Sequence, residues 1–323
     1  MASMARTSLY LVTGGAGFIG SHLVERLLRD GHRVRVLDNF STGSRANLGF
    51  ARGDRRLEVI RGDLGSLASV ERAVRGTTAV FHQAAMRSVP RSVADPLGCH
   101  ASNVTGMLHL LHAAARQRKK PRIVYASSSS VYGERPELPK REDQVTDPIS
   151  PYAATKVAGE LYASVWSRLF GVEAVGLRYF NVYGPRQDPK SEYAAVIPRF
   201  ILWGAERRPL QVHGDGTQSR DFTYIDNVVA ANLLAARADA AVVSGKSYNV
   251  GCGRRTSLLE IVALLERMLW RPLARKHLPR RVGDVPHTLA DIGRAKRDLG
   301  YEPLVEFEEG LARTVRFFTG RNA

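Results

Sequence analysis

Short apolar runs alternate with amphipathic stretches along the first half of the chain. Leu23, Leu27 and Leu28 follow the first apolar run at helical spacing. Strands that alternate with helices build parallel sheets with helices on both faces, so the pattern predicts an α/β fold with a doubly wound parallel sheet. The apolar runs of strand length are residues 9–12, 34–37 and 123–126.

The second half of the chain is richer in loop signals. Proline and glycine become denser after Tyr183, as is typical of loops and short helices. Ser257 is a good N-cap for a helix over residues 258–269, and residues 247–250 are expected to return to the sheet as a strand. We therefore predict a sheet domain over residues 1–182, with strands returning from about 220–250, and a smaller lobe over residues 183–323.

A glycine-rich turn joins the first predicted strand to the first helix. Gly14, Gly15 and Gly17 let the backbone approach a pyrophosphate, and Gly20 lets the helix pack close to the sheet. Asp38 ends the second apolar run, where its carboxylate can accept hydrogen bonds from an adenosine ribose. An ordinary glycine-rich turn with a loop acid is the alternative, which the order of strand, turn, helix, strand and acid disfavours. The motif predicts a Rossmann-type domain that binds NAD rather than NADP.

Tyr152 and Lys156 lie one helical turn apart in a predicted helix. Ser150 is a plausible N-cap, and Pro151 suits the first helical position. An ammonium roughly 6 Å from the phenol, at an effective dielectric near 20, favours the phenolate by about 3 kcal/mol. We therefore expect the pKa of Tyr152 to fall by about two units. Tyr152 could then take a proton from a sugar hydroxyl while hydride leaves the same carbon for a nicotinamide.

A run of four serines follows the predicted strand at residues 123–126. Ligands of open α/β sheets bind outside the carboxyl ends of the strands, so these hydroxyls are placed where a substrate is expected. Ser128 is a candidate to relay a proton between the substrate and Tyr152. The alternative is a loop whose serines bond to their own backbone.

Eight segments of the chain together resemble the extended short-chain dehydrogenase/reductases, and within them the nucleotide-sugar 4-epimerases. The resemblance covers nearly the whole chain. It implies an NAD-dependent isomerase that inverts C4 of a UDP-sugar through a transient 4-keto sugar. The segments are residues 13–21, 38–43, 62–64, 82–85, 128–133, 152–156, 177–185 and 220–226.

The resemblance also implies roles for individual residues. Ser128, Tyr152 and Lys156 are the implied catalytic residues. Arg220 and Arg281 are the implied diphosphate clamps, since arginine binds phosphate bidentately, although any single arginine in this arginine-rich chain can instead be a solvated surface residue. The implied NAD contacts are Gly14, Gly17, Phe18, Ile19, Gly20, Asp38, Asn39, Ser41, Gly43, Asp63, Leu64, Gln83, Ala84, Ala85, Tyr152, Lys156 and Tyr179. The implied UDP-sugar contacts are Arg87, Ser88, Ser128, Ser129, Asn181, Ala195, Val196, Gln211, Arg220, Arg281, Asp284 and Thr288.

Three segments, residues 88–92, 186–189 and 193–198, resemble the epimerases that interconvert UDP-N-acetylglucosamine and UDP-N-acetylgalactosamine. Epimerases restricted to non-acetylated sugars carry tyrosine at the place of Thr288, and the smaller side chain leaves space for an N-acetyl group. UDP-glucose and UDP-galactose would also fit. UDP-glucuronate epimerases tolerate a small residue there too. Arg87 stands where a small residue is expected, and it either contacts a charged sugar substituent or faces solvent.

The sequence leaves three alternatives to 4-epimerisation: decarboxylation, dehydration and a non-enzymatic role. A UDP-glucuronate decarboxylase shares the fold and the tyrosine, and Glu134 is a weak hint of it. A 4,6-dehydratase carries an acid pair where this chain has Ser129 and Ser130. A non-enzymatic NAD sensor would not need the catalytic residues. The net charge of +16 suggests a polyanion partner, but only eight of the 47 basic residues are lysine and the arginines are scattered, so no nucleic-acid partner is expected.

Composition predicts a cytoplasmic enzyme. No apolar stretch reaches the roughly twenty residues of a membrane span, and the first strand begins too early to leave room for a signal segment. Cys99 and Cys252 show no metal or redox spacing, so we expect reduced thiols and no metal site. The resemblance implies a homodimer paired through helices near residues 101–116 and 151–170, whose apolar positions are equally explained by packing on their own sheet.

Overall fold

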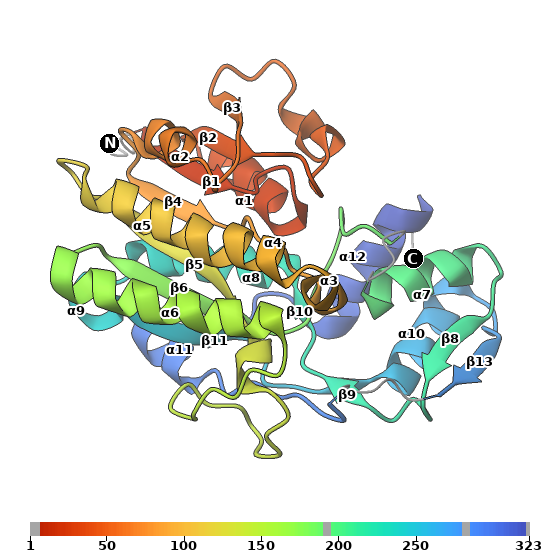
Figure 1. Cartoon of the computed structure of the whole chain (residues 1–323). Helices are drawn as coiled ribbons and strands as arrows, with labels where there is room; N and C mark the ends of the chain where they lie inside the picture. Colours follow the sequence, from red (N-terminus) through yellow and green to blue (C-terminus); the bar gives the residue numbers. More distant parts are fainter. Residues whose placement is uncertain (1–6, 190–194, 280–284, 321–323) are drawn as a thin grey trace. The chain divides into compact units, whose positions relative to one another are not determined.

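A seven-stranded sheet forms the centre of the first of two units into which the chain divides (Figure 1). The computed structural model describes residues 7–189, 195–279 and 285–320. The first unit comprises Met1–Val131, Pro148–Arg178 and Val229–Tyr248. In their order across the sheet, the strands are β11 (Lys246–Val250), β6 (Ala174–Tyr179), β5 (Arg122–Ser128), β4 (Ala79–His82), β1 (Leu9–Thr13), β2 (Arg33–Asp38) and β3 (Leu57–Arg61).

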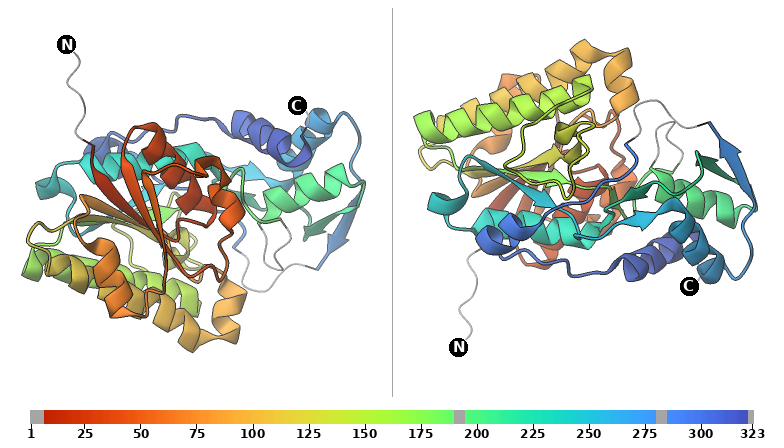
Figure 2. Two further views of the ribbon diagram at one scale, coloured as in Figure 1. Left: turned by 90° about the horizontal axis from the view of Figure 1, so that it is seen from above. Right: turned by 90° about the horizontal axis from the view of Figure 1, so that it is seen from below.

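Helices cover both faces of this sheet, which confirms the predicted doubly wound fold. Helices α2, α5 and α6 lie on one face, and α1 and most of α8 lie on the other (Figures 1 and 2). The helices are α1 (Phe18–Arg29), η1 (Arg45–Ala51), α2 (Leu67–Val74), α3 (Val89–Ala94), α4 (Pro96–His100), η2 (Ala101–Thr105), α5 (Gly106–Ala115), η3 (Ser129–Tyr132), α6 (Pro151–Phe170), α8 (Ile225–Arg237) and α9 (Ala240–Val243).

The strand order explains where a ligand can bind. Pairing between β3, β2, β1, β4 and β5 is parallel throughout. The chain leaves β1 toward β2 on one side and later returns to β4 on the other, so the carboxyl ends of β1 and β4 form the switch point of the sheet. Open α/β sheets bind ligands in the crevice at this point.

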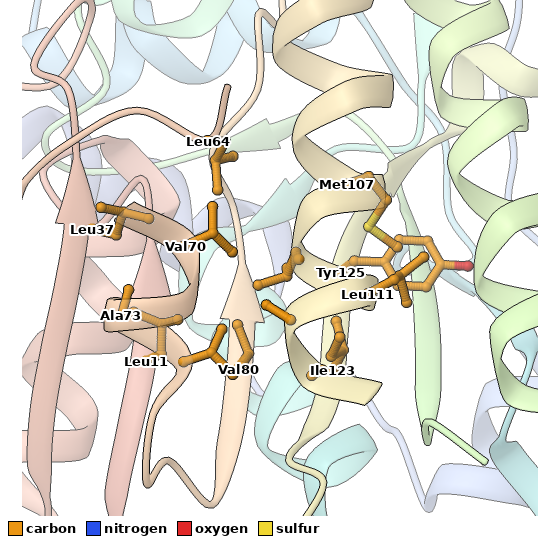
Figure 3. Packing of buried hydrophobic residues seen from close by; sticks show 14 of the residues in the cluster. Leu11, Leu37, Leu64, Val70, Ala73, Val80, Met107, Leu111, Ile123 and Tyr125 are labelled. Atoms are coloured by element: carbon orange, nitrogen blue, oxygen red, sulfur yellow. The ribbon is translucent and has the colours of Figure 1, made fainter. Parts of the chain in front are cut away.

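The core between the sheet and helices α2 and α5 is built from apolar side chains of both the strands and the helices. Leu11, Val80 and Ile123 from neighbouring strands are fully buried, and they face Val70 of α2 and Leu111 of α5 (Figure 3). Strands covered on both faces are apolar along their length, as the runs in the sequence are. Burying a side chain of this size contributes about 1.5–3 kcal/mol.

The helix predicted near residues 101–116 is not uniform. The π-helical turn η2 joins α4 to α5. Such a turn is frequent at functional sites, because it rotates the side chains that precede it relative to those that follow. Asn103 of this turn is buried, and it bonds to both backbone groups of Met86 through its Oδ1 (2.8 Å) and Nδ2 (3.1 Å) atoms.

The second unit is built from short strand pairs and helices. It comprises Tyr132–Asp147, Tyr179–Val228 and Asn249–Ala323. The predicted helix after Ser257 is confirmed, with a capping box between Ser257 and Glu260. Its elements are β7 (Val182–Tyr183), α7 (Val196–Ala205), β8 (Leu210–His213), β9 (Ser219–Arg220), β10 (Thr223–Tyr224), β12 (Thr256–Ser257), α10 (Leu258–Leu269), β13 (Arg275–Leu278), α11 (Gly293–Leu299) and α12 (Phe307–Thr319).

The two units are not consecutive in the chain. Tyr132–Asp147 belongs to the second unit, and Val229–Tyr248 belongs to the first. The strand predicted at residues 247–250 does return to the sheet as β11, beside β6. Within the described residues, none of the helices combines the length and the apolar character needed to cross a membrane.

Candidate active site

A pocket of about 420 Å³ lies at the switch point of the first unit. It contains every predicted NAD contact except Tyr152, Lys156 and Tyr179. Its other lining residues include Arg87, Arg91, Gly98, Ala101 and Ser102, of which only Arg87 was singled out from the sequence. The last two belong to the π-helical turn, which no local sequence signal predicted. The predicted residues that line the pocket are Gly14, Gly17, Phe18, Ile19, Gly20, Asp38, Asn39, Ser41, Gly43, Asp63, Leu64, Gln83, Ala84 and Ala85.

The glycines of the first turn are required by close backbone contacts. Gly14 has a φ of +66°, and a Cβ there would lie 2.7 Å from the amide nitrogen of Ala84. A Cβ on Gly20 would lie 2.1 Å from the carbonyl oxygen of Gly14. The backbone therefore forms a cradle that side chains would fill. Together with the N-terminus of α1, it suits the pyrophosphate of a dinucleotide.

Asp38 places a carboxylate in the pocket, where the adenosine ribose of NAD is predicted to bind. Its Oδ2 accepts a hydrogen bond from the amide of Ala16 (2.9 Å), and its Oδ1 accepts one from the amide of Phe40 (2.8 Å). Each carboxylate oxygen retains a lone pair that can accept a ribose hydroxyl. A buried anion at this position repels a 2′-phosphate, so the pocket fits NAD.

The first turns of α6 carry the predicted catalytic pair. Ser150 caps this helix by accepting a hydrogen bond from the amide of Ala153 (3.2 Å), as predicted. The Nζ atom of Lys156 lies 5.7 Å from the centroid of the Tyr152 ring and donates to the carbonyl of Ala126 at 2.8 Å. The helix therefore presents a phenol and an ammonium side by side, and the ammonium is anchored to β5.

Ser128 is the last residue of β5, and its hydroxyl oxygen acts as an acceptor toward the serine-rich turn. Its Oγ accepts hydrogen bonds from the amide (3.2 Å) and the hydroxyl (2.9 Å) of Ser130. The Ser128 hydroxyl is therefore free to donate, and it is hydrogen-bonded to Tyr152. The bond from the Ser130 amide is of the local kind that the alternative interpretation expected, and the proton relay through Ser128 stays a prediction.

The expected depression of the pKa of Tyr152 is wrong for the protein alone. Burial raises the pKa of Tyr152, while the hydrogen bond from Ser128 and the charge of Arg87 lower it. Burial also lowers the pKa of Lys156 to about 8, because the ammonium is itself desolvated. The attraction between the two charges is outweighed by the cost of removing both groups from water, which favours their neutral forms.

The remaining predicted residues of the first unit surround this region. Arg87 is exposed and lines the cofactor pocket, and Ser88 caps α3 by accepting from the amide of Arg91. Ser129 begins the 3₁₀ turn after β5. Behind the pair, His82 is buried beside the Lys156 charge, and desolvation and that charge lower the pKa of His82 to about 3. The imidazole is therefore neutral and does not act as a base at physiological pH.

A cavity of about 240 Å³ lies in the second unit. The predicted contacts that line it are Asn181, Ala195, Val196, Gln211 and Arg220. Sequence reasoning missed several further lining residues, among them four with aromatic or amide groups that form no motif: Phe200, Trp203, His213 and Gln218. Aromatic faces and amides suit a nucleobase, and arginine suits a diphosphate.

Hydrogen bonds hold Asn181 and Arg220 in place at this cavity, and one of them links Thr288 to Asn181. Asn181 has a φ of +28°, and its Nδ2 atom donates to Thr288 Oγ1 and to the carbonyl of Asp221, both at 3.3 Å. Arg220 is held by the carbonyls of Ser219 and Pro286, both at 3.0 Å. Tyr179 is buried at the end of β6. Arg281 and Asp284 lie outside the described residues.

Asp221 organises the backbone beside the cavity. Its Oδ1 accepts from the amide of Cys252 (2.7 Å), and its Oδ2 accepts from the amides of Gly253 (2.9 Å) and Ala290 (3.2 Å). The side chain is fully buried, and burial raises the pKa of Asp221 to about 6 against the effect of these amides. Its place next to Arg220 was visible in the sequence, but its partners come from distant segments.

The first unit has the features of a nicotinamide-dependent enzyme of the short-chain dehydrogenase/reductase type: a Rossmann-type sheet, a glycine cradle followed by Asp38, and Tyr152 and Lys156 on one helix. The model of the NAD dependent epimerase/dehydratase family matches residues 10–251. The chain belongs to this family. Its relatives are NAD-dependent UDP-sugar 4-epimerases, so the protein is an NAD-dependent isomerase of this class.

Individual relatives differ in the sugar that their names give. The UDP-glucose 4-epimerase of Mycolicibacterium smegmatis is 38% identical over 320 residues, which is 97% of this chain and 99% of the relative. A solved UDP-N-acetylglucosamine 4-epimerase of Methanobrevibacter ruminantium, bound to UDP-N-acetylmuramic acid, has a TM-score of 0.92 and 38% identity, covering 98% of this chain and 99% of the other. A solved UDP-glucuronic acid 4-epimerase of Bacillus cereus, bound to UDP-glucuronic acid and NAD, has a TM-score of 0.89 and 32% identity, covering 97% and 99%.

Proposed function

We propose that the protein interconverts UDP-N-acetylglucosamine and UDP-N-acetylgalactosamine, and that it also accepts UDP-glucose and UDP-galactose. The observation that carries this proposal is the small side chain of Thr288, hydrogen-bonded to Asn181 on the wall of the cavity in the second unit. The first unit binds NAD, and the second binds the UDP-sugar. Arg281 and Asp284 remain proposed contacts to the diphosphate and the uridine ribose.

In this proposal, Tyr152 holds and returns the proton of the C4 hydroxyl. Ser128 donates to the Tyr152 oxygen and so stabilises the phenolate. Lys156 keeps a positive charge beside the ring. The glycine cradle and Asp38 would hold NAD, which would supply a reversible hydride acceptor for C4, so the reaction would need no external oxidant. The diphosphate clamp residues hold the nucleotide while the 4-keto sugar turns its other face.

Product analysis with three sugars tests the substrate. Purified protein is incubated separately with UDP-N-acetylglucosamine, UDP-glucose and UDP-glucuronate, and the C4 epimers are resolved by chromatography and proton NMR. We expect epimers from the first two sugars. Turnover of UDP-glucuronate alone would replace the proposal with a glucuronate epimerase, in which the exposed Arg87 of the cofactor pocket serves the carboxylate. Release of carbon dioxide or water from any sugar would indicate a decarboxylase or a dehydratase.

A larger side chain at position 288 should reduce activity on the N-acetylated UDP-sugars but not on the non-acetylated ones. Thr288→Tyr places a phenol where the N-acetyl group is proposed to lie, so we expect kcat/KM for UDP-N-acetylglucosamine to fall at least about tenfold. UDP-glucose should retain most of its kcat/KM. Thr288→Ser is the matched control, because it keeps the hydroxyl that bonds to Asn181. An equal loss for both sugars in Thr288→Tyr would contradict the assignment of this wall.

The proposed homodimer pairs the outer face of α6 with its counterpart. Leu161 and Leu169 lie eight residues apart on this helix and are 64% and 72% exposed, and Leu97 of the neighbouring α4 is 83% exposed. Apolar side chains in a row are covered in most proteins, because exposed patches promote association. A second copy of the chain, with the same row, would cover them.

Charges placed in that row should dissociate the dimer. We expect wild-type protein to have twice the mass of the chain in light scattering, and Leu161→Glu/Leu169→Glu to have the mass of one chain. Leu304→Glu is the control, since Leu304 is 68% exposed in the second unit, outside the row. A wild-type monomer, or a dimer that survives the double change, would refute this interface.

A cytoplasmic location is also part of the proposal. Cys99 and Cys252 are both free thiols, and disulfides persist mainly in oxidising compartments. Among the described residues, no group of three or more histidine, cysteine or acidic side chains is placed to bind a metal ion.

A further inference from the structure

A buried ion pair lies on the same helix face as the catalytic pair, one turn further along α6. Glu160 and Arg178 have side chains that are only 11% and 7% exposed. Arg178 Nε donates to Glu160 Oε1 at 2.9 Å, and Arg178 Nη2 donates to Oε2 at 2.7 Å. The Oε1 atom also accepts the hydroxyl proton of Ser127 at 2.6 Å. The carboxylate therefore links α6 to the carboxyl ends of both β5 and β6.

Three successive turns of α6 engage three successive residues of β5. Tyr152 is hydrogen-bonded to Ser128, Lys156 donates to the carbonyl of Ala126, and Glu160 accepts from Ser127. The bond to Glu160 holds Ser127, which lies between Ala126 and Ser128 in β5. We propose that Glu160 is a positioning residue, which holds Ser127 so that Ser128 stays aligned with Tyr152, and which keeps an anion next to Lys156. The inference rests on the proposed roles of Tyr152 and Lys156, but not on which sugar is turned over.

A contribution to folding stability does not by itself explain why Glu160 and Arg178 are buried as an ion pair. Removing two charges from water costs several kcal/mol per ion, and apolar side chains of similar volume often stabilise a fold as well or better. The ion pair also provides a directional hydrogen bond to β5, which apolar side chains could not form. Glu160 bonds to a strand residue next to the proposed proton relay, and a hydroxyl bond of 2.6 Å to a carboxylate is short and directional.

The charge of Glu160 also acts on Lys156. Burial lowers the pKa of Lys156 to about 8, and the neighbouring Cys99 of α4 and Glu160 raise it in opposition to burial. The other titratable groups facing the ammonium are Tyr152 and His82 of β4, and His82 is neutral. The ammonium must stay protonated to act, so activity is lost as pH rises through the pKa of Lys156. Without Glu160 that loss begins at lower pH.

The first test is the pH profile of Glu160→Gln. We expect the alkaline limb of kcat/KM to move down by about one pH unit, since a neutral amide no longer favours the charged form of Lys156. At pH values above the alkaline limb, the variant should therefore have about a tenfold lower kcat/KM than the wild type. The substrate is whichever of the three sugars the wild type turns over, and circular dichroism and bound NAD are measured on the same sample. A profile that keeps the wild-type limb would overturn the electrostatic half of the inference.

Two further variants separate charge, alignment and folding. Glu160→Gln/Arg178→Met removes both charges of the ion pair, and we expect it to fold while keeping the lowered alkaline limb. Ser127→Ala keeps the Glu160 charge but breaks the bond to β5, so it should lower kcat about tenfold with the alkaline limb unmoved. Wild-type kcat in folded Ser127→Ala would overturn the alignment half. Wild-type activity in Tyr152→Phe would instead show that the proposed function has failed.

Discussion

Tyr152→Phe should lower epimerase turnover by about three orders of magnitude while the protein stays folded and binds NAD. Loss of a positioned acid or base costs about 10²–10⁴-fold in rate. The change removes only the hydroxyl that is bonded to Ser128, and the ring can still face Lys156 as it does in the wild type, at 5.7 Å. Proton NMR of the sugar products measures the rate, and circular dichroism and NAD absorbance measure the fold and the cofactor.

The matched control for this prediction is Tyr162→Phe. Tyr162 lies on the same helix, packs beside Trp166 and takes no part in the proposed chemistry. We expect it to keep wild-type turnover. Because burial raises the pKa of Tyr152, turnover in the wild type should rise with pH on the acid side of its optimum, and the residual rate of Tyr152→Phe should lack this rise. Equal turnover in Tyr152→Phe and the wild type would show that another group moves the proton.

Local features were predicted well from the sequence, because their causes are local. The glycine turn, the strand ending in Asp38 and the capped start of α6 each depend on residues within a few positions of one another. The order of these segments then predicts the sheet, since a switch point follows from alternating strands and helices. Of the seventeen NAD contacts that the glycine motif and the family resemblance together predicted, fourteen line one pocket, and Tyr152, Lys156 and Tyr179 do not.

Features that depend on burial or on distant segments were not predicted. The distance between Tyr152 and Lys156 was close to expectation, but the direction of the pKa shift was reversed by desolvation, which spacing along a helix does not report. Glu160 has no motif in the sequence, because its partners Ser127 and Arg178 come from β5 and β6. The π-helical turn that lines the pocket likewise has no signal in helical periodicity.

Asp221→Leu should destabilise the second unit more than any single surface change. Three amides, those of Cys252, Gly253 and Ala290, would lose their acceptor, and Ala290 is buried. An unsatisfied buried donor costs about 1–3 kcal/mol and a partly exposed one costs less, so we expect the free energy of unfolding to fall by roughly 3 kcal/mol. For a chain of this size that is a drop of roughly 10 °C in the thermal midpoint. Affinity for the UDP-sugar should fall as well, because Arg220 is the preceding residue and lines the cavity.

The isosteric Asp221→Asn separates the hydrogen bonds from the charge. The pKa of Asp221 in the folded protein, about 6, lies above its ordinary value of 3.8. The folded state thus binds this proton more tightly than the unfolded chain, and the stability that Asp221 contributes is complete below about pH 4 and lost as pH rises through 6. We expect Asp221→Asn to remove this slope, while its amide oxygen still accepts one or two of the amides. The difference in thermal midpoint between wild type and Asp221→Asn, followed from pH 4.5 to 8, should therefore shrink toward high pH. A difference that grows toward high pH would mean that the amides stabilise the carboxylate more than burial penalises it, and that Asp221 is ionised throughout.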